Sequence, residues 1–345
     1  MGWYFWLHPL RGIAAIAVVL LHCYWSWSFY DSSFVRRMYL MVDFFFVLSG
    51  FVISAGYANK INKLPDLFKF IIRRFNRLKF NYYWSGAAWI GAMIVAGLWN
   101  IDKDATISLV QYLTFTDVAF TKNLYRINPV AWSVMSEFFV YAIFGFAIIL
   151  IRNINTLILV TMLIFTLGIS YLSQRYSNLN VMYGEGALIR AMTGFAIGSF
   201  CWQSYFYFKN PFLSKMGLIF VFLLAILLNY IGDNTDVFIF SISAAVLLFA
   251  APLPAPSNAA LNSFFRWLGD VSYPVYMWHF VIAVGMGKVL QKISAFDLAF
   301  FNGEKFLVVP ASVGDFALVL VVVFSLIAAS ISLKLERKLS KFRSL

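Results

Sequence analysis

The chain is short of several residue types that soluble proteins use freely. Its 345 residues include only two Cys, three His and 15 Asp plus Glu, and 12% of them are charged. A soluble domain carries roughly a quarter charged residues, so a soluble enzyme and a disordered chain are both excluded. Cys23 and Cys201 lie in separate apolar segments, which excludes a disulfide scaffold and leaves no paired spacing for a metal. We therefore expect no metal site.

Apolar sequence is abundant instead. Hydrophobic residues make up 62% of the chain, and they recur in blocks of about 17 to 22 residues, which is the length of a helix that crosses a hydrocarbon core. This pattern predicts an all-α, multi-pass membrane bundle of about ten helices. We expect one membrane domain over 1–345, with no appended soluble domain. The predicted spans are 11–30, 38–58, 81–99, 131–151, 155–172, 186–208, 212–230, 236–252, 271–290 and 315–334.

The excess of basic residues predicts an orientation. The formal net charge is +12, and Lys and Arg gather at the ends of apolar blocks, above all in the cluster from Lys60 to Lys79. Cytoplasmic segments retain such residues, so we predict both termini in the cytoplasm and the protein in the cell membrane. The charge then needs no nucleic-acid partner. The stretch from Ile107 to Phe115 is apolar enough for a re-entrant or interfacial segment.

Ionisable residues inside the apolar blocks are candidate functional groups, because burying a charge in lipid is costly. Arg11 and His22 are eleven residues apart, which places them on one helix face, roughly 16 Å apart. A neutral His22 could take a proton from a hydroxyl; a packing hydrogen bond is the structural alternative. Asp43 in the second span could orient His22, as a carboxylate does in a hydrolase triad. Ser49 and Gly50 form a small-residue break that would let another helix or a ligand approach the backbone, and plain helix packing is the structural alternative.

Three arginines precede the third span. Arg73, Arg74 and Arg77 are spaced by three and four residues, so all three could converge on one ligand. Guanidinium groups at a membrane surface suit the phosphates of a lipid head group or a nucleotide. The alternative is a cluster that only fixes the topology.

Two polar stripes lie on otherwise apolar helices. Ser133, Glu137 and Tyr141 are spaced by four and share a face. The residues of a second stripe, spaced by four and three, also share a face. Such stripes line a cavity or join two helices, and spacing does not decide between these roles. Glu137 is also a candidate partner for a buried arginine across the bundle, Arg190. The second stripe consists of Ser272, Tyr276 and His279.

In chain order, these motifs resemble those of the acyltransferase 3 family, the integral-membrane O-acyltransferases. A proline usually follows the Arg-x-x-Arg pair in this family, whereas this chain reads Leu78-Lys-Phe-Asn81, which predicts a straighter helix there. The matching segments are Arg11-x10-His22, Asp43-Phe-Phe-Phe with Ser49-Gly-Phe51, Arg74-Phe-Asn-Arg77, Trp132-Ser-Val-Met-Ser-Glu137 and Ser272-Tyr-Pro-Val-Tyr276-Met-Trp-His279.

The resemblance implies an acyl-CoA donor, usually acetyl-CoA, and a carbohydrate hydroxyl as acceptor. Arg11, with the three arginines of the Arg73–Arg77 cluster, would hold the CoA phosphates. His22 would act as general base or as acyl carrier, with Asp43 orienting it. Donors such as Tyr276 or Ser133 would stabilise the oxyanion. Glu137 and His279 are further catalytic candidates; a helix-to-helix hydrogen bond is the alternative for His279.

Other functions also fit polar stripes in a bundle. A proton-coupled transporter of a small anion or sugar would use a similar channel, although the sequence has no inverted repeat. An acyltransferase that acts on a lipid or protein acceptor is a third interpretation. If the acceptor is a sugar, we expect the external loops 100–130 and 291–314 to set specificity through Trp and Tyr side chains.

Overall fold

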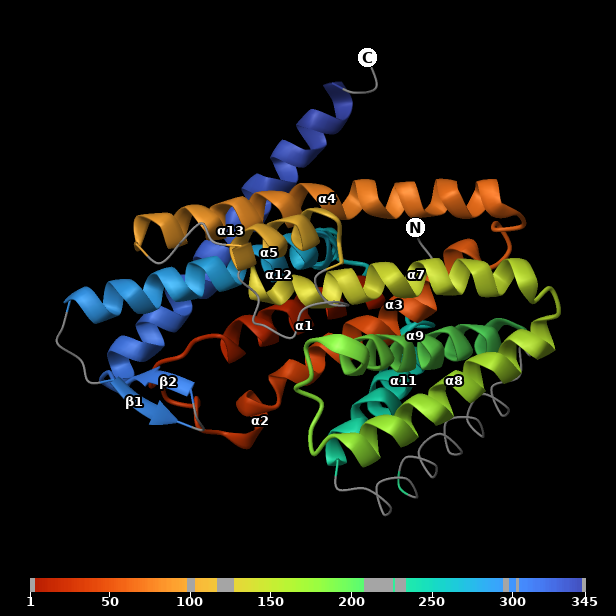
Figure 1. The fold of residues 1–345 in the computed structure, drawn as a ribbon, viewed down its shortest axis with the longest axis horizontal. Coiled ribbons are helices and arrows are strands. Elements are labelled where there is room, and N and C mark those ends of the chain that lie inside the picture. The colour runs from red at the N-terminus through yellow and green to blue at the C-terminus, as the bar shows by residue number, and fades with distance from the viewer. Residues whose placement is uncertain are drawn as a thin grey trace.

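The computed structural model describes residues 4–97, 103–116, 127–207, 226, 234–293, 298–301 and 304–342. It is a bundle of helices with one small hairpin at an end of the molecule (Figure 1). The elements are α1 (Leu7–Leu21), α2 (Ser33–Arg36), η1 (Met38–Leu40), α3 (Met41–Tyr57), α4 (Leu64–Val95), α5 (Lys103–Leu113), η2 (Pro129–Ala131), α7 (Trp132–Leu150), α8 (Ile154–Arg175), α9 (Gly184–Tyr207), η3 (Thr235–Val237), α11 (Phe238–Ala250), α12 (Ala259–Ile293), β1 (Leu298–Phe301), β2 (Glu304–Leu307) and α13 (Ala311–Phe342).

The prediction of a helical bundle is confirmed, because each predicted span that the structure describes contains a helix. The span predicted at 212–230 lies outside the described residues, apart from residue 226. In the described part of the chain, four helical segments are long and apolar enough to cross a membrane, and two apolar helices, Leu7–Leu21 and Thr235–Ala250, are shorter. The count of ten spans and the orientation of the termini stay predictions. The four long segments are Ser33–Tyr57, Pro129–Leu150, Ile154–Arg175 and Ala311–Leu339.

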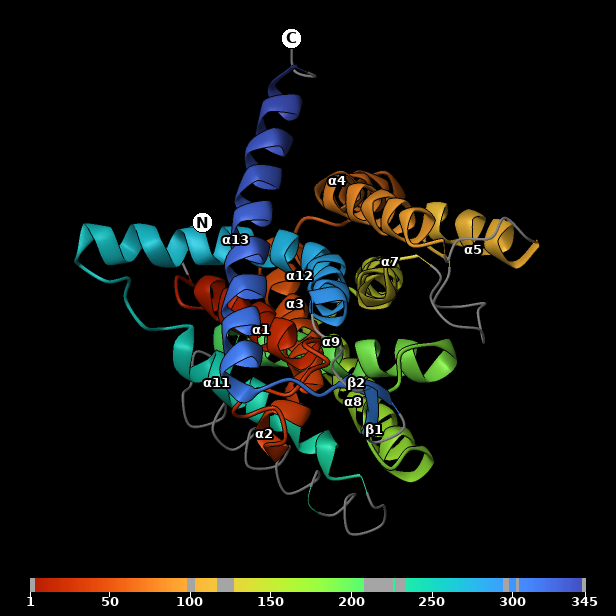
Figure 2. The same ribbon diagram turned by 90° about the vertical axis from the view of Figure 1, so that its left-hand side faces the viewer.

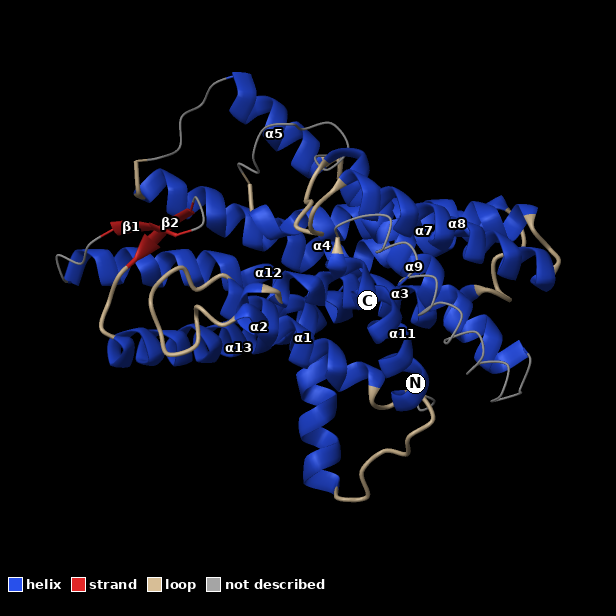
Figure 3. Ribbon diagram, turned by 90° about the horizontal axis from the view of Figure 1, so that it is seen from below, coloured by secondary structure: helices blue, strands red, loops and turns tan. Residues whose placement is uncertain are grey.

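The prediction that the first span continues to residue 30 is wrong. α1 ends at Leu21, and His22 is its C-cap. The next residues leave the helix because they pair with β2: Leu307 N donates to Tyr24 O (3.1 Å), and Ser26 N donates to Leu307 O (3.0 Å). β1 and β2 themselves pair antiparallel. This hairpin lies beside one end of α12 (Figure 3) and is an addition to the helical fold that hydropathy did not predict.

α1, α3 and α9 lie in the middle of the bundle (Figure 2). In the apolar window of Ser33–Tyr57, 72% of the residues are buried within the protein, against 28% for that of Ala311–Leu339, so α3 is central and α13 peripheral. α3 and α9 approach closely because each presents a glycine: a Cβ on Gly50 would overlap the Phe195 carbonyl, and one on Gly198 would overlap that of Val47. The packing role predicted for Gly50 is confirmed.

α4 and α12, which carry candidate site residues, are much longer than the spans predicted within them. α4 has 32 residues and runs unbroken from the basic segment into the predicted span, in agreement with the straighter helix expected where the family usually has a proline. α12 has 35 residues and contains Pro274, which has no N–H for the helical hydrogen bond. α12 changes direction along its length (Figures 2 and 3). The two helices bring the arginine cluster and the Ser272–His279 stripe into the bundle.

Candidate active site

His22 stands at the C-terminal end of α1, where the chain turns away toward β2. Its Nδ1 atom lies 2.8 Å from the carbonyl oxygen of Val18, one turn back. A carbonyl oxygen only accepts hydrogen bonds, so Nδ1 carries the proton in the neutral ring. The other ring nitrogen, Nε2, is then left with a lone pair. The local helix thus prepares His22 as a base at Nε2.

A second histidine supports this assignment. His279 Nε2 lies 3.2 Å from His22 Nδ1, and His279 Nδ1 lies 3.2 Å from the carbonyl oxygen of Val275. Because Val275 O accepts the Nδ1 proton, Nε2 of a neutral His279 is an acceptor and faces the His22 N–H. The tautomers follow from these partners. His279 is fully buried, so the structure brings it to His22 and not to a surface that a substrate could reach.

Asp43 does not contact His22, and this part of the sequence prediction is wrong. Both of its carboxylate oxygens bind Arg190: Arg190 Nε donates to Oδ1 and an Nη donates to Oδ2, each at 2.6 Å. Both side chains are buried. Arg190 also donates to the carbonyls of Val181 and Tyr39, each at 3.2 Å. Arg190 therefore joins α9 to α3 through Asp43, and Glu137 is not its partner.

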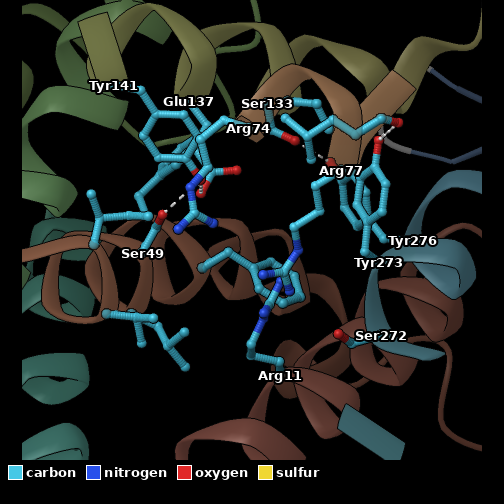
Figure 4. A pocket seen from close by; sticks show the side chains of 17 residues that line it. Arg11, Ser49, Arg74, Arg77, Ser133, Glu137, Tyr141, Ser272, Tyr273 and Tyr276 are labelled. Carbon is cyan, nitrogen blue, oxygen red and sulfur yellow. Dashed lines mark hydrogen bonds between the residues drawn. The ribbon is translucent and has the colours of Figure 1, made fainter. Parts of the chain in front are cut away.

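A pocket at the other end of α1 collects most of the remaining candidates. We call it the arginine pocket; its volume is about 80 Å³, and its charged lining residues are Arg11 from α1, Arg74 and Arg77 from α4, and Glu137 from α7. Figure 4 shows the three arginines pointing into the same space. Three guanidinium groups face one carboxylate, so the pocket favours an anion.

Arg73 is placed differently from Arg74 and Arg77. It is exposed and is not among the described residues that line the pocket. The structure therefore brings Arg74 and Arg77 together in this pocket, and the convergence of Arg73 on the same ligand stays a prediction.

Glu137 belongs to a hydrogen-bonded chain on the wall of the arginine pocket. The Tyr141 hydroxyl donates to Glu137 Oε1 (2.6 Å) and lies 3.1 Å from Ser49 Oγ (Figure 4). The guanidinium of Arg74 lies over the Tyr141 ring, 5.7 Å from its centroid. The Nε of Arg74 is buried and has no hydrogen-bond partner among the residues that the structure describes. This donor is suited to an anionic ligand.

Tyr276 lies between the two ends of the site. Its hydroxyl donates to the carbonyl of Val130 (2.9 Å) and lies 2.7 Å from Ser133 Oγ. The structure therefore brings together the two predicted oxyanion donors. Tyr276 lines the arginine pocket and also a larger cavity on the His22 side.

This larger cavity, which we call the aromatic chamber, has a volume of about 630 Å³ and includes His22 in its lining. Sequence reasoning did not find it, because it is assembled from segments far apart in the chain. The sequence feature that could have indicated this cavity is the aromatic stretch that follows His22, Tyr24-Trp-Ser-Trp27. Its aromatic walls include Tyr24, Trp27, Tyr30, Trp132, Phe280 and Phe306.

Comparison with known proteins gives the family. A family model described as an acyltransferase domain, Acyl_transf_3, matches residues 4–334. A Bacillus subtilis (strain 168) protein, provisionally named peptidoglycan O-acetyltransferase YrhL, is 25% identical over 315 residues; the match covers 81% of this chain and 48% of that protein, so this chain spans about half of the relative's length. A protein of Acidianus two-tailed virus, provisionally named acetyltransferase ORF330, is 23% identical over 297 residues, covering 81% of this chain and 83% of that protein. No solved structure matches the chain. By its family model and by the motifs gathered around His22 and the arginine pocket, the chain belongs to the acyltransferase 3 family.

Proposed function

We propose that this protein is a membrane O-acetyltransferase that moves an acetyl group from acetyl-CoA to a hydroxyl of a cell-surface or secreted carbohydrate. The observation that carries the proposal is the position of Tyr276, which lines both the arginine pocket and the aromatic chamber that contains His22. An anionic donor and a hydroxyl acceptor could thus meet from two sides. The relative provisionally named as a peptidoglycan O-acetyltransferase supports a carbohydrate acceptor.

The arginine pocket is the proposed donor site. Arg11, Arg74 and Arg77 would hold CoA phosphates by charge-assisted hydrogen bonds, and the partnerless Nε of Arg74 supports this fit. Arg11 and His22 are separated by about 16 Å of helix, a length comparable with an extended pantetheine arm. We place this pocket on the cytoplasmic side of the cell membrane, with both termini, in agreement with the positive-inside rule.

His22 is the proposed catalytic base. Its Nε2 would take the proton of the acceptor hydroxyl while that oxygen attacks the thioester carbonyl carbon. The new C–O bond forms, the C–S bond breaks, and the leaving sulfur takes the proton back from His22. Tyr276 and Ser133, whose hydroxyls lie 2.7 Å apart, would stabilise the oxyanion once the Tyr276 O–H turns toward it from the Val130 carbonyl, to which it donates in this structure. In the variant mechanism, His22 Nε2 attacks the carbonyl itself and carries the acetyl group.

The remaining polar residues have supporting roles in this proposal. His279 holds the tautomer of His22. Glu137 balances part of the arginine charge, and Asp43 fixes Arg190 in the wall of the aromatic chamber.

The test is transfer of radiolabelled acetyl from acetyl-CoA to glycan by the purified protein in detergent. His22→Ala should lower the rate by roughly 10²- to 10⁴-fold. His8→Ala is the matched control, because His8 lies on the same helix and binds Asp270 (3.0 Å) away from the chamber. Near-normal transfer by His22→Ala would refute the mechanism. Label that only crosses a vesicle membrane, with none bound covalently, would favour a transporter.

A further inference from the structure

The aromatic chamber differs in chemistry from the arginine pocket, although the two share Tyr276. Among the described residues that line the chamber there is no Asp or Glu, and its two basic residues are Arg36 and Arg190. Arg190 is neutralised by its buried pair with Asp43, and Arg36 lies 3.6 Å from Asp31. The chamber therefore has little uncompensated charge and is suited to a neutral ligand.

Its walls combine aromatic rings with amide groups. Tyr30 and Phe306 stack on each other with centroids 4.4 Å apart and an interplanar angle of 26°. The Tyr24 ring lies 6.1 Å from the His22 ring and is 36% exposed. Asn178 and Asn180 line the same space. Flat apolar faces beside hydrogen-bonding amides match a sugar ring, which has C–H faces and hydroxyl edges.

The aromatic wall is held in place before any ligand arrives. The backbone of residues 24–26 pairs with β2. Ser26 Oγ donates to Val309 O (2.6 Å) and accepts from Val309 N (2.7 Å). Ser28 N donates to a carboxylate oxygen of Asp315 in α13 (2.8 Å). A fixed backbone beneath the aromatic side chains lowers the ordering cost of binding, as expected of a binding platform.

We propose that the aromatic chamber is the acceptor subsite and that it binds a neutral pyranose ring against Tyr24 and the Tyr30–Phe306 pair, with the reacting hydroxyl at His22. This inference rests on the proposed function, and it assigns the acceptor to a carbohydrate instead of a lipid or a protein. It also assigns acceptor recognition to the segment after His22 and to β2. Tyr24 and Tyr30 are then specificity-determining residues.

The experiment compares Michaelis constants for the two substrates. Purified full-length protein is assayed with radiolabelled acetyl-CoA and a panel of neutral, N-acetylated and acidic oligosaccharides, beginning with chitotriose and cellotriose. Tyr24→Ala and Tyr30→Ala should each raise the KM for a neutral saccharide at least about fivefold, the loss of one ring contact. The KM for acetyl-CoA should stay unchanged. Tyr24→Phe and Tyr30→Phe keep the ring and should keep saccharide binding.

Tyr183→Ala is the matched control, because Tyr183 is 51% exposed and is not among the described residues that line the chamber. Unchanged saccharide KM in Tyr24→Ala and Tyr30→Ala would overturn the proposal, as would transfer to a lipid alcohol or a peptide hydroxyl with none to any saccharide. Preference for the acidic oligosaccharides would overturn the neutral-ring assignment. Calorimetry with acetyl-CoA distinguishes a failure of the proposed function from a failure of the acceptor subsite. If acetyl-CoA does not bind, the proposed function fails. If it binds while the saccharide results are negative, only the acceptor subsite fails.

Discussion

His279 Nε2 lies 3.2 Å from His22 Nδ1, so a buried histidine, and not a carboxylate, faces the proposed base. The two residues are 257 positions apart in the chain and join α12 to the end of α1. With Val18 and Val275 accepting at the two Nδ1 atoms, each imidazole has one defined donor and one defined acceptor. This arrangement leaves His22 Nε2 as the basic nitrogen without placing a negative charge beside it.

Removing the acceptor at position 279 should slow the chemistry without weakening donor binding. We expect His279→Leu to lower kcat at least about tenfold, because the Nδ1 proton of His22 would lose its second acceptor and the ring would be held less firmly. The KM for acetyl-CoA should change little. His279→Gln keeps a side-chain oxygen that can accept from His22 Nδ1, and it should restore part of kcat. Equal kcat in the Leu variant, the Gln variant and the parent protein would reduce His279 to a packing residue.

The pair between Asp43 and Arg190 should matter for stability more than for chemistry. Asp43→Asn leaves the buried Arg190 charge uncompensated, which costs roughly 3–5 kcal/mol. We expect a lower Tm in detergent and less folded protein, while the folded fraction keeps its specific activity. Replacing both residues, as Asp43→Leu with Arg190→Met, should recover part of the Tm. An Asp43→Asn protein with normal Tm and no activity would instead place Asp43 in the reaction.

The contact between α3 and α9 predicts a sharp difference between two glycines of one helix. Gly50→Ala would press a methyl group into the Phe195 carbonyl, whereas a Cβ at Gly56 meets nothing within 4 Å. Overpacking costs typically about 1–3 kcal/mol, so Gly50→Ala should lower the Tm. Gly56→Ala should leave the Tm unchanged or raise it slightly, since Ala favours the helix. Equal Tm values for the two variants would show that α3 and α9 do not pack this closely.

The helices could be predicted from the sequence because their signal is local. A block of apolar residues long enough to span a membrane must satisfy its own backbone, and only a helix does so within one segment. The end of α1 could not be predicted in this way. Residues 23–30 are apolar enough to continue the helix, but Tyr24 and Ser26 pair with Leu307. Hydropathy is a local property and gives no information about a partner that is distant in the sequence.

The same distinction between local sequence signals and tertiary contacts applies to the candidate site. Arg11 and His22 share a helix, so their spacing could be read directly, and the face that Arg74 shares with Arg77 follows from the helical period. Which helices face each other is a tertiary property. The partner of Asp43 is 147 residues away, and another basic residue, His22, was an equally plausible choice from charge alone. Only the packed bundle distinguishes a catalytic carboxylate from one that fixes two helices together.

Two neighbouring arginines of α4 give the final test of the donor site. Arg77→Ala removes a guanidinium from the arginine pocket, whereas Arg73→Ala removes one that is not among the described residues lining the pocket. A hydrogen bond to a charged group contributes about 1.5–3 kcal/mol, so Arg77→Ala should raise the KM for acetyl-CoA roughly 10- to 100-fold. The KM of Arg73→Ala should stay near that of the parent. Equal effects of the two substitutions would show that these arginines act through overall charge and topology, because a pocket that holds phosphates must distinguish an arginine in its lining from one outside it.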